Sequence, residues 1–459
     1  MIPQNPVIQM TLKQICSPVA VVGGGLAGAE AAWQLAERGV QVRLFEMRPQ
    51  KNTPAHETEL LGELVCSNSL GGKNVTTPAG ILKAELAALG SFMMDCAEKS
   101  KVPAGNALAV DRELFARRVT EKISSHPNIE IVRAEVSDIP EGPAIISTGP
   151  LTSEPMANRL SELVGEGFLY FFDAVAPIVT LESIDAQHSF RANRYGTDGD
   201  YINCPMNQEQ YHLFWEALVN AETASKHSFE EKEMRHFEGC LPVEVIAKRG
   251  EQTLLFGPLR PVGFQSATNG EEHCAVVQLR QDNSDGTLFN MVGFQTNLKW
   301  GEQERVFRMI PALENAEFVR KGVMHRNLFV CAPKVLDGYL RPIGKKDLFL
   351  AGQITGVEGY VESISMGFAS ALFMYSLLNG TEMPKFPRET AIGSLLDYLS
   401  SAVAQTFQPM NVNLGIFPKL PGKKIHKRTE RCEAYAKRSE EAVLSFIKEH
   451  SELFTILPK

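Results

Sequence analysis

The feature that most constrains this chain is a glycine-rich turn between two short apolar runs, within residues 18–46. Val19–Val22 is the first run, an alanine-rich stretch with helical spacing then continues to Arg38, and Val40–Phe45 is the second run. Short apolar runs bounded by turn residues are typical of buried strands, whereas apolar residues at helical spacing indicate a helix. The sequence therefore predicts a strand, a glycine turn, a helix and a second strand.

Each glycine of the turn has a physical task. A tight turn requires Gly23, close approach of a pyrophosphate to the backbone requires Gly25, and close packing of the helix on the strand requires Gly28. The helix N-terminus then faces the phosphates, and an acid roughly 20 residues further on can accept hydrogen bonds from ribose hydroxyls. We expect a bound dinucleotide rather than a merely structural turn, held by Gly23, Gly24, Gly25, Leu26, Ala27, Gly28 and Glu46.

The composition is that of a globular chain of two or three domains, because 459 residues with 44% hydrophobic content can fill ordinary cores. No apolar run reaches the roughly 18 residues of a membrane-spanning helix, and residues 1–13 lack the order of a signal peptide, so we expect a cytoplasmic protein without a membrane partner. Eight scattered cysteines with no CxxC pair predict neither disulfides nor a metal site. The net charge of −8 argues against nucleic-acid binding by the whole surface, although a local basic patch can still bind it.

Helices and strands alternate after the first turn. The spacing of apolar residues predicts helices over Ile81–Glu98 and Arg112–Ser124, the second capped by Asp111. Short strands are predicted over Ile129–Ala134 and Ala144–Ile146, and the Ser-Thr-Gly-Pro that follows is typical of a strand that closes beside the first glycine turn.

The predicted secondary structure changes in the middle of the chain, which has short β-rich runs, Asp-Gly turns and few long helices. We interpret residues 151–329 as an inserted substrate domain, and residues 1–150 with 330–459 as a discontinuous FAD-binding domain. The predicted fold class is therefore α/β, a Rossmann-like FAD-binding domain of the glutathione-reductase type with an inserted β-rich α+β domain.

A second glycine-rich turn follows the apolar run that ends at Ala351, and it leads into a helical run to Leu378. Many FAD enzymes place an aspartate after the first glycine of this turn to hold the ribityl chain, whereas this chain has a glutamine, which can both donate and accept hydrogen bonds. Two nucleotide-binding turns favour FAD over NAD. We expect the second turn to contact FAD through Gly352, Gln353, Gly359 and Tyr360.

A basic segment lies near the C-terminus. It contains Lys423, Lys424, Lys427 and Arg428. Two interpretations stand equally: a patch that contacts RNA phosphates, or the solvated start of a helix.

Several segments together resemble one family. GGGLAGAEAAWQLA, ELVCSNSLGG, FEGCLPVEV, AGQITGVEGYVES and MNVNLGIFP are similar to motifs of the folate- and FAD-dependent tRNA uracil-5 methyltransferases, over nearly the whole chain. The resemblance implies transfer of a methylene group from methylenetetrahydrofolate to C5 of uridine 54 in the tRNA T loop. The methylene is then reduced to a methyl, with FAD supplying electrons and NADPH or NADH refilling it.

The resemblance assigns functional cysteines to Cys66 and Cys240, where an arbitrary cysteine would be a small buried hydrophobe. Uracil C5 becomes nucleophilic when a thiolate adds at C6, and a base must then remove the C5 proton. We favour Cys240 as the nucleophile, because it lies in the inserted domain, and Cys66 as the base or one-carbon partner near the flavin. A nearby cation such as Lys248 or Arg249 would help to activate a thiol.

Three consecutive residues at the domain join are further candidates. His325 can stack on a pterin while Arg326 and Asn327 hydrogen-bond its edge, and the alternative is a surface turn before a strand at Leu328–Cys331.

Other functions of the whole protein also stay open. They are the related flavoenzyme of wobble-uridine carboxymethylaminomethyl modification, a non-catalytic flavin-containing RNA-binding protein, and a small-molecule flavin oxidoreductase.

Overall fold

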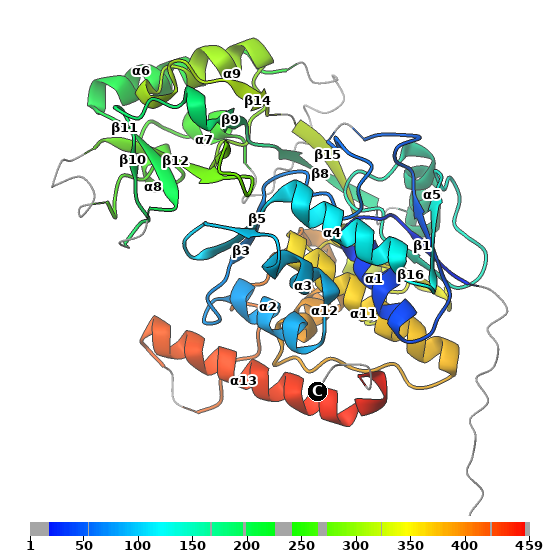
Figure 1. The fold of residues 1–459 in the computed structure, drawn as a ribbon. Helices are drawn as coiled ribbons and strands as arrows, with labels where there is room; N and C mark the ends of the chain where they lie inside the picture. Colours follow the sequence, from blue (N-terminus) through cyan, green and yellow to red (C-terminus); the bar gives the residue numbers. More distant parts are fainter. Residues whose placement is uncertain are drawn as a thin grey trace, which may run out of the picture.

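The computed structural model describes residues 18–53, 55–165, 168–195, 199–224, 241–264, 273–322, 324–422 and 425–454. These residues form two lobes (Figure 1). One contains the first and last parts of the sequence, and the other contains the middle part, drawn in green at the upper left. Each lobe has its own cluster of buried apolar side chains.

A five-stranded parallel sheet organises the first lobe. Its strands over residues 19–22, 144–146 and 348–350 are almost wholly buried, which suits their continuous apolar sequences, whereas the strands over 42–46 and 129–133 also carry the exposed Arg43 and Glu130. The strand order is β16 (Leu348–Leu350), β7 (Ala144–Ile146), β1 (Val19–Val22), β2 (Val42–Glu46) and β6 (Ile129–Arg133). The predicted strand, glycine turn, helix and strand at the start of the chain are confirmed.

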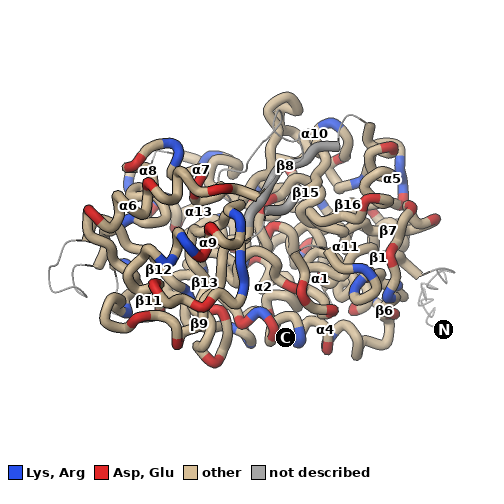
Figure 2. The backbone as a smooth tube through the Cα atoms, turned by 90° about the horizontal axis from the view of Figure 1, so that it is seen from above, with Lys and Arg blue, Asp and Glu red and all other residues tan. Residues whose placement is uncertain are grey.

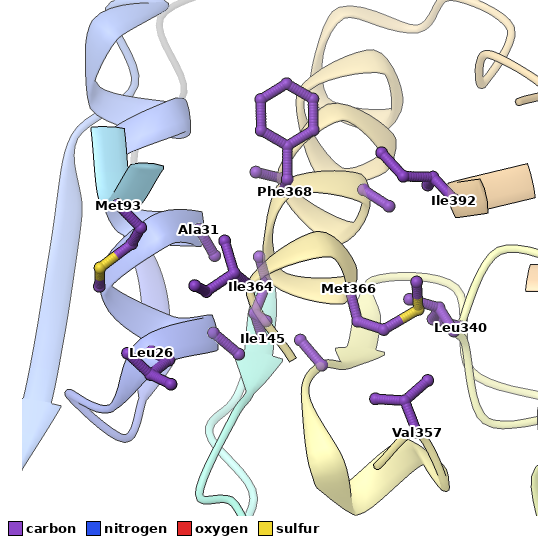
Figure 3. Close-up of a cluster of buried hydrophobic side chains, with 14 of the residues drawn as sticks. Leu26, Ala31, Met93, Ile145, Leu340, Val357, Ile364, Met366, Phe368 and Ile392 are labelled. Carbon is purple, nitrogen blue, oxygen red and sulfur yellow. The ribbon is translucent and has the colours of Figure 1, made fainter. Parts of the chain in front are cut away.

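Two helices that start at the glycine turns pack side by side on this sheet. They are α1 (Leu26–Glu37) and α11 (Tyr360–Asn379). A Cβ atom at Gly367 of α11 would lie 2.2 Å from the carbonyl oxygen of Ala27, so only glycine permits this approach. Ala31 and Ile364 face one another across the contact (Figure 3). By length and composition α11 could cross a membrane, but 83% of its apolar window is buried inside the protein.

The single helix predicted over Ile81–Glu98 is wrong. The chain instead forms α2 (Pro78–Ala88) and α3 (Phe92–Glu98). Gly90 between them has a φ of 84°, which ends the first helix, and the Ser91 hydroxyl caps the second by accepting from the Met94 N–H. The apolar spacing continues across the break because both helices bury one face against the same core.

A buried glutamate fixes α3 on α1. The carboxylate of Glu30 in α1 accepts hydrogen bonds from the Ser91 hydroxyl at 2.8 Å and from the Met93 N–H at 3.1 Å. Burial raises the pKa of Glu30 to about 7, against the lowering effect of these hydrogen bonds. The next predicted helix is confirmed as α4 (Arg112–Ser125), with the Asp111 carboxylate accepting from the Leu114 N–H at 2.9 Å.

The second lobe is an antiparallel sheet with helices packed against it. Its core is separate and includes Phe214, Phe289 and Phe294. The strand order is β10 (Phe190–Arg191), β11 (Tyr201–Met206), β12 (Ala275–Gln281), β13 (Leu288–Met291), β9 (Ile178–Thr180) and β14 (Phe318–Arg320), and the helices are α6 (Gln208–Val219), α7 (Val243–Lys248), α8 (Thr253–Phe256) and α9 (Trp300–Phe307). This lobe matches the predicted β-rich α+β class.

A two-stranded ribbon connects the lobes. Its strands are β8 (Phe168–Ala174) and β15 (Met324–Val330), which pair antiparallel (Figure 1). Before the ribbon, α5 (Glu154–Val164) buries Met156 and Leu160 in the core of the first lobe. The domain boundaries at residues 151 and 329 stay predictions.

The outer parts of the first lobe complete the frame around the site. A small sheet has the order β3 (Ser69–Gly72), β5 (Ala107–Val110) and β4 (Lys101–Val102), and the remaining helices include α10 (Ala332–Val335), α12 (Ala391–Ser401) and α13 (Arg428–Glu449). Helix α13 runs along the lower edge of the lobe (Figure 1). Basic and acidic residues are interspersed over both lobes (Figure 2).

Candidate functional site

A cleft opens at the carboxyl ends of the parallel strands, where such sheets bind their ligands. Its free space is about 1010 Å³, open solvent at the mouth included, which suits a nucleotide cofactor. Of the predicted cofactor residues, all except Gly28 and Gly359 line it. The lining also includes Arg48, His56, Glu63, Val65, residues 147–153 and Ser363.

The first glycine turn has the shape that a dinucleotide requires. A Cβ atom at Gly25 would meet nothing within 4 Å, so the backbone borders open cleft at this point. At Gly28 a Cβ atom would lie 1.8 Å from the carbonyl oxygen of Gly23, so Gly28 serves the packing of α1 beneath the turn. The Ser147 hydroxyl donates to the carbonyl of Val22 at 2.9 Å, which confirms that the Ser-Thr-Gly segment closes beside this turn. These residues fit a bound pyrophosphate at the N-terminus of α1.

Glu46 lies in the cleft, but an arginine holds its carboxylate. Arg48 donates from Nε to Oε1 at 3.0 Å and from Nη2 to Oε2 at 3.1 Å, and the Gly24 N–H donates to Oε2 at 3.1 Å. Burial raises the pKa of Glu46, but the hydrogen bonds and charge of Arg48 outweigh it and hold the pKa below its usual value. Arg48 also donates from Nη1 to the Glu63 carboxylate at 2.9 Å, which fixes the polar loop that follows β2.

The second glycine turn contributes an amide and a phenol to the cleft. The Gln353 amide donates to the Glu358 carboxylate at 2.7 Å, which orients the side chain predicted to face the ribityl chain. Gly359 precedes α11 with a φ of 114°, and a Cβ atom there would lie 2.2 Å from the Glu362 carboxylate. Burial raises the pKa of the Tyr360 phenol.

Tyr360 anchors the turn that carries Cys66. Its hydroxyl accepts from the backbone N–H of Cys66 at 2.8 Å and of Ser67 at 3.1 Å. The flanking carbonyls are held from other elements: Arg320 of β14 donates to Val65 at 2.9 Å, and Arg112 of α4 donates to Cys66 at 3.3 Å. Cys66 is partly exposed, and its neighbours Val65 and Tyr360 line the cleft.

A buried amide joins this turn to the second lobe. The Asn68 side chain is fully buried, and its amide donates to the carbonyls of Val110 at 3.0 Å and of Gln281 at 2.8 Å. The Asn68 amide oxygen accepts from Nε of Arg280 in β12 at 2.9 Å. Three hydrogen bonds therefore use the donors and the acceptor of one side chain, two of them across the lobe boundary.

An ion pair crosses the same boundary. Arg112 donates from Nε to the Asp282 carboxylate at 2.9 Å, and both side chains are largely buried. Burial lowers the pKa of Arg112, but the charge and hydrogen bond of Asp282, together with the nearby Tyr360 and Cys66, raise it above its usual value. The charges of Arg112 and Arg280 both interact with Cys66, and cations beside a cysteine stabilise its thiolate. We call Asn68, Arg112, Arg280 and Asp282 the lobe-bridging network.

Several other predicted residues lie wholly or partly outside the described residues. Cys240, Lys423 and Lys424 lie outside the described residues, as do the side chains of His325 and Arg326. The backbone of residues 325–327 belongs to β15, so the alternative of a surface turn is wrong: the strand begins at Met324 because these residues pair with β8. Asn327 is buried. Lys427 and Arg428 are exposed at the start of α13, where Lys427 forms an ion pair with Glu430 at 2.9 Å.

Sequence reasoning missed the arginines of the site. Arg48 follows the predicted acid by two residues, and this closeness was the only available signal for it. Arg112 and Arg280 appear in the sequence as ordinary charges on a helix and a strand. Their partners lie 170 and 212 residues away, so no local pattern marks them.

Comparisons with known proteins agree on one family. The family model described as glucose inhibited division protein A matches residues 18–382. A methylenetetrahydrofolate--tRNA-(uracil-5-)-methyltransferase TrmFO from Desulforudis audaxviator is 56% identical over 95% of this chain and 99% of its own. A protein of the same name from Shouchella clausii is 52% identical over 96% of this chain and 100% of its own.

Solved structures show the same fold. GidA from Aquifex aeolicus, in its form II crystal, superposes with a TM-score of 0.68 at 17% identity, covering 96% of this chain and 74% of that chain. Its form I crystal gives a TM-score of 0.66.

The open space beside Gly25 predicts how a side chain at this position would affect flavin binding. A Gly25→Val protein should fold normally, because the added atoms enter open space, but should lose its yellow flavin absorbance, because they occupy the place of a pyrophosphate. Visible absorbance and thermal unfolding of the purified protein measure the two effects. Gly338→Val is the matched control, since a Cβ atom there also meets nothing within 4 Å and lies away from the cleft. Normal flavin absorbance in folded Gly25→Val would contradict this assignment.

Proposed function

The chain belongs to the glucose inhibited division protein A family and, within it, to the folate-dependent tRNA uracil-5 methyltransferases, and from this premise we propose how it methylates the T-loop uridine of tRNA. The observation that carries the proposal is the position of Cys66. Its turn is anchored on Tyr360 at the cleft and is clamped by Arg112 and Arg320 where the two lobes meet. A uridine inserted between the lobes would reach both this cysteine and the cleft.

The two cysteines divide the chemistry. Cys240 adds as a thiolate to C6 of uracil, and the electrons pushed to C5 attack the methylene carbon of methylenetetrahydrofolate as the first of its two carbon–nitrogen bonds breaks. Cys66 takes the C5 proton, and the remaining bond between the methylene carbon and a folate nitrogen breaks, which releases the folate and leaves an exocyclic methylene. Hydride addition to that methylene expels the Cys240 thiolate from C6 and restores the uracil ring with a methyl group.

The residues that would hold FAD are those of the two glycine turns. Gly23, Gly24 and Gly25 offer backbone to the pyrophosphate, Glu46 faces the adenosine ribose, and Gln353 faces the ribityl chain. When bound, FAD supplies the hydride that reduces the methylene, and NADPH or NADH is the proposed source of its electrons. Arg48 keeps Glu46 ionised, which favours acceptance from ribose hydroxyls.

Folate and tRNA have proposed contacts of their own. His325, Arg326 and Asn327 are our proposed pterin site, and support comes from their backbone lying in β15 of the ribbon that connects the lobes. Lys423, Lys424, Lys427 and Arg428 remain a proposed phosphate-contacting patch. The proposed setting of the reaction is the cytoplasm, where tRNA and reduced folates are available.

Transfer of the folate carbon is the direct test. The purified protein, incubated with unmodified tRNA transcript, [14C]methylenetetrahydrofolate and NADPH, should place the label in 5-methyluridine of the T loop. Nucleoside analysis of the digested tRNA measures this. Label in another nucleoside, or tRNA binding with no label transferred, would contradict the proposed function.

The cysteine roles predict different behaviour with 5-fluorouridine at the target site, because loss of the C5 substituent is then blocked and an adduct accumulates. Cys66→Ala should still form a denaturation-resistant RNA adduct, whereas Cys240→Ala should form none. Gel electrophoresis under denaturing conditions measures the adduct. An adduct with Cys240→Ala but not with Cys66→Ala would reverse the assignment, and an adduct with both variants would mean that neither is the sole nucleophile.

A further inference from the structure

The inserted lobe carries arginine and aromatic side chains away from the cleft: Arg194 and Tyr195 hydrogen-bond to the backbone of residues 260–263, and the exposed Phe256 lies four residues before Arg260 in the sequence. We propose that Arg194, Tyr195, Phe256 and Arg260 form a tRNA-docking surface, in which the arginines bind a backbone phosphate and the rings stack on unpaired bases. This inference rests on the proposed function and adds to it the part of the second lobe that holds the RNA. We call these four residues the docking surface.

Two like charges interact on the docking surface, those of Arg194 and Arg260. Arg194 donates from Nη1 to the carbonyls of Arg260 and Val262 and from Nε to the Gln278 amide at 2.8 Å. Burial lowers the pKa of Arg194, and the nearby charge of Arg260 lowers it further. Among the described residues, no carboxylate forms an ion pair with either arginine. Arg194 already uses Nε and Nη1 on protein acceptors and stacks on the Phe264 ring at 4.6 Å, so its charge attracts an anion while the exposed Arg260 guanidinium offers the N–H donors that a phosphate accepts.

Tyr195 is held outward by an unusual backbone conformation. Its φ is 58°, in the left-handed region that bulky residues rarely adopt, and its N–H donates to the carbonyl of Gly263 at 2.9 Å. Such strain persists where the surrounding structure enforces it, often at functional positions. The ring is nevertheless 70% exposed, and Phe256 at the end of α8 is 85% exposed. Exposed aromatic rings beside arginines are what single-stranded RNA bases stack upon.

The docking surface is continuous with the Cys66 site along one strand. Gln278, which binds Arg194, and Arg280, which binds Asn68, lie two residues apart in β12 and share one face of the sheet. Two residues of a strand span about 7 Å. Asp200 and Tyr201 also bind the loop at Gly105 and Ala104 of the first lobe, at 3.2 Å for the Tyr201 hydroxyl. RNA held at Tyr195 therefore has a short path to the lobe boundary at which Cys66 lies.

RNA fits this surface better than a protein partner does. A protein interface of similar aromatic and arginine content would need acids opposite the arginines, whereas every RNA nucleotide carries the complementary charge. The whole chain has a net charge of −8, so an unneutralised arginine pair is a local exception. A second copy of this acidic chain is correspondingly less suitable as the occupant.

Three variants separate phosphate binding from stacking. Arg260→Gln removes a charge without disturbing the bonds that Arg194 makes to backbone carbonyls. Tyr195→Asn removes the ring and keeps a residue that tolerates positive φ, and Phe256→Ser removes the most exposed ring. Ile343→Gln with Lys345→Gln is the matched control, because it removes an exposed apolar side chain and an exposed cation from the first lobe.

Binding of T-arm RNA and of whole tRNA should be measured across salt concentrations, with flavin absorbance and the rate of flavin reduction by NADPH as readouts of an intact first lobe. We expect Tyr195→Asn to raise the Kd about tenfold, and Arg260→Gln to raise it while reducing the slope of log K against log salt by about 0.7 to 0.9. Flavin reduction should be unchanged in every variant, and the control should bind as the wild type does.

Unchanged RNA affinity in all three variants would overturn the inference while leaving the proposed function intact. A variant that changes only the sedimentation mass of the protein, and not its RNA affinity, would reassign the surface to self-association and would equally overturn it. A wild-type protein that binds no tRNA would instead contradict the proposed function, and with it any docking surface.

Discussion

The side chain of Asn68 is the point on which the arrangement of the two lobes depends. It is fully buried, and its amide and its oxygen are hydrogen-bonded to Val110, Gln281 and Arg280. A buried polar group that loses its partners costs about 1 to 3 kcal/mol, so any relative movement of the lobes that breaks these bonds is opposed. The adjacent ion pair of Arg112 and Asp282 adds a charged contact between the lobes. Removing either partner would leave the other as an unpaired buried charge, which destabilises the folded state.

This constraint also fixes the position of Cys66, the residue that we propose as the base. Cys66 lies two residues before Asn68, and its backbone is held by Tyr360 on one side and by Arg112 on the other. The two arginines of the lobe-bridging network, Arg112 and Arg280, carry positive charge that interacts with the Cys66 thiol. One set of side chains therefore both joins the lobes and places positive charge near the Cys66 thiol. A substrate held by the second lobe would meet Cys66 in a fixed position beside the flavin cleft.

The sequence predicted what is encoded locally and missed what depends on distant pairing. Both glycine turns, the strands around them and the cap at Asp111 follow from short-range patterns, and all of these elements are present. The break between α2 and α3 was missed because Gly90 and Ser91 interrupt the chain without interrupting its apolar spacing. Strand β15 was expected to begin late, since its first residues are polar and extend only through pairing with β8. The lobe-bridging network could not be predicted, because its partners lie about 200 residues apart in sequence and only the fold brings them together.

The central claim is that the lobe-bridging network, and not the flavin cleft alone, sets up methyl transfer. Replacing Asp282 by Asn while measuring two half-reactions on the same protein, flavin reduction by NADPH and methyl transfer to tRNA, tests it most directly. Asp285→Asn, an exposed neighbour in the same turn, is the control. The account predicts an unchanged flavin content and reduction rate in Asp282→Asn together with methyl transfer that falls at least about tenfold, the factor that 1.4 kcal/mol corresponds to. Methyl transfer at the wild-type rate, or a loss that merely follows a loss of bound flavin, would contradict it.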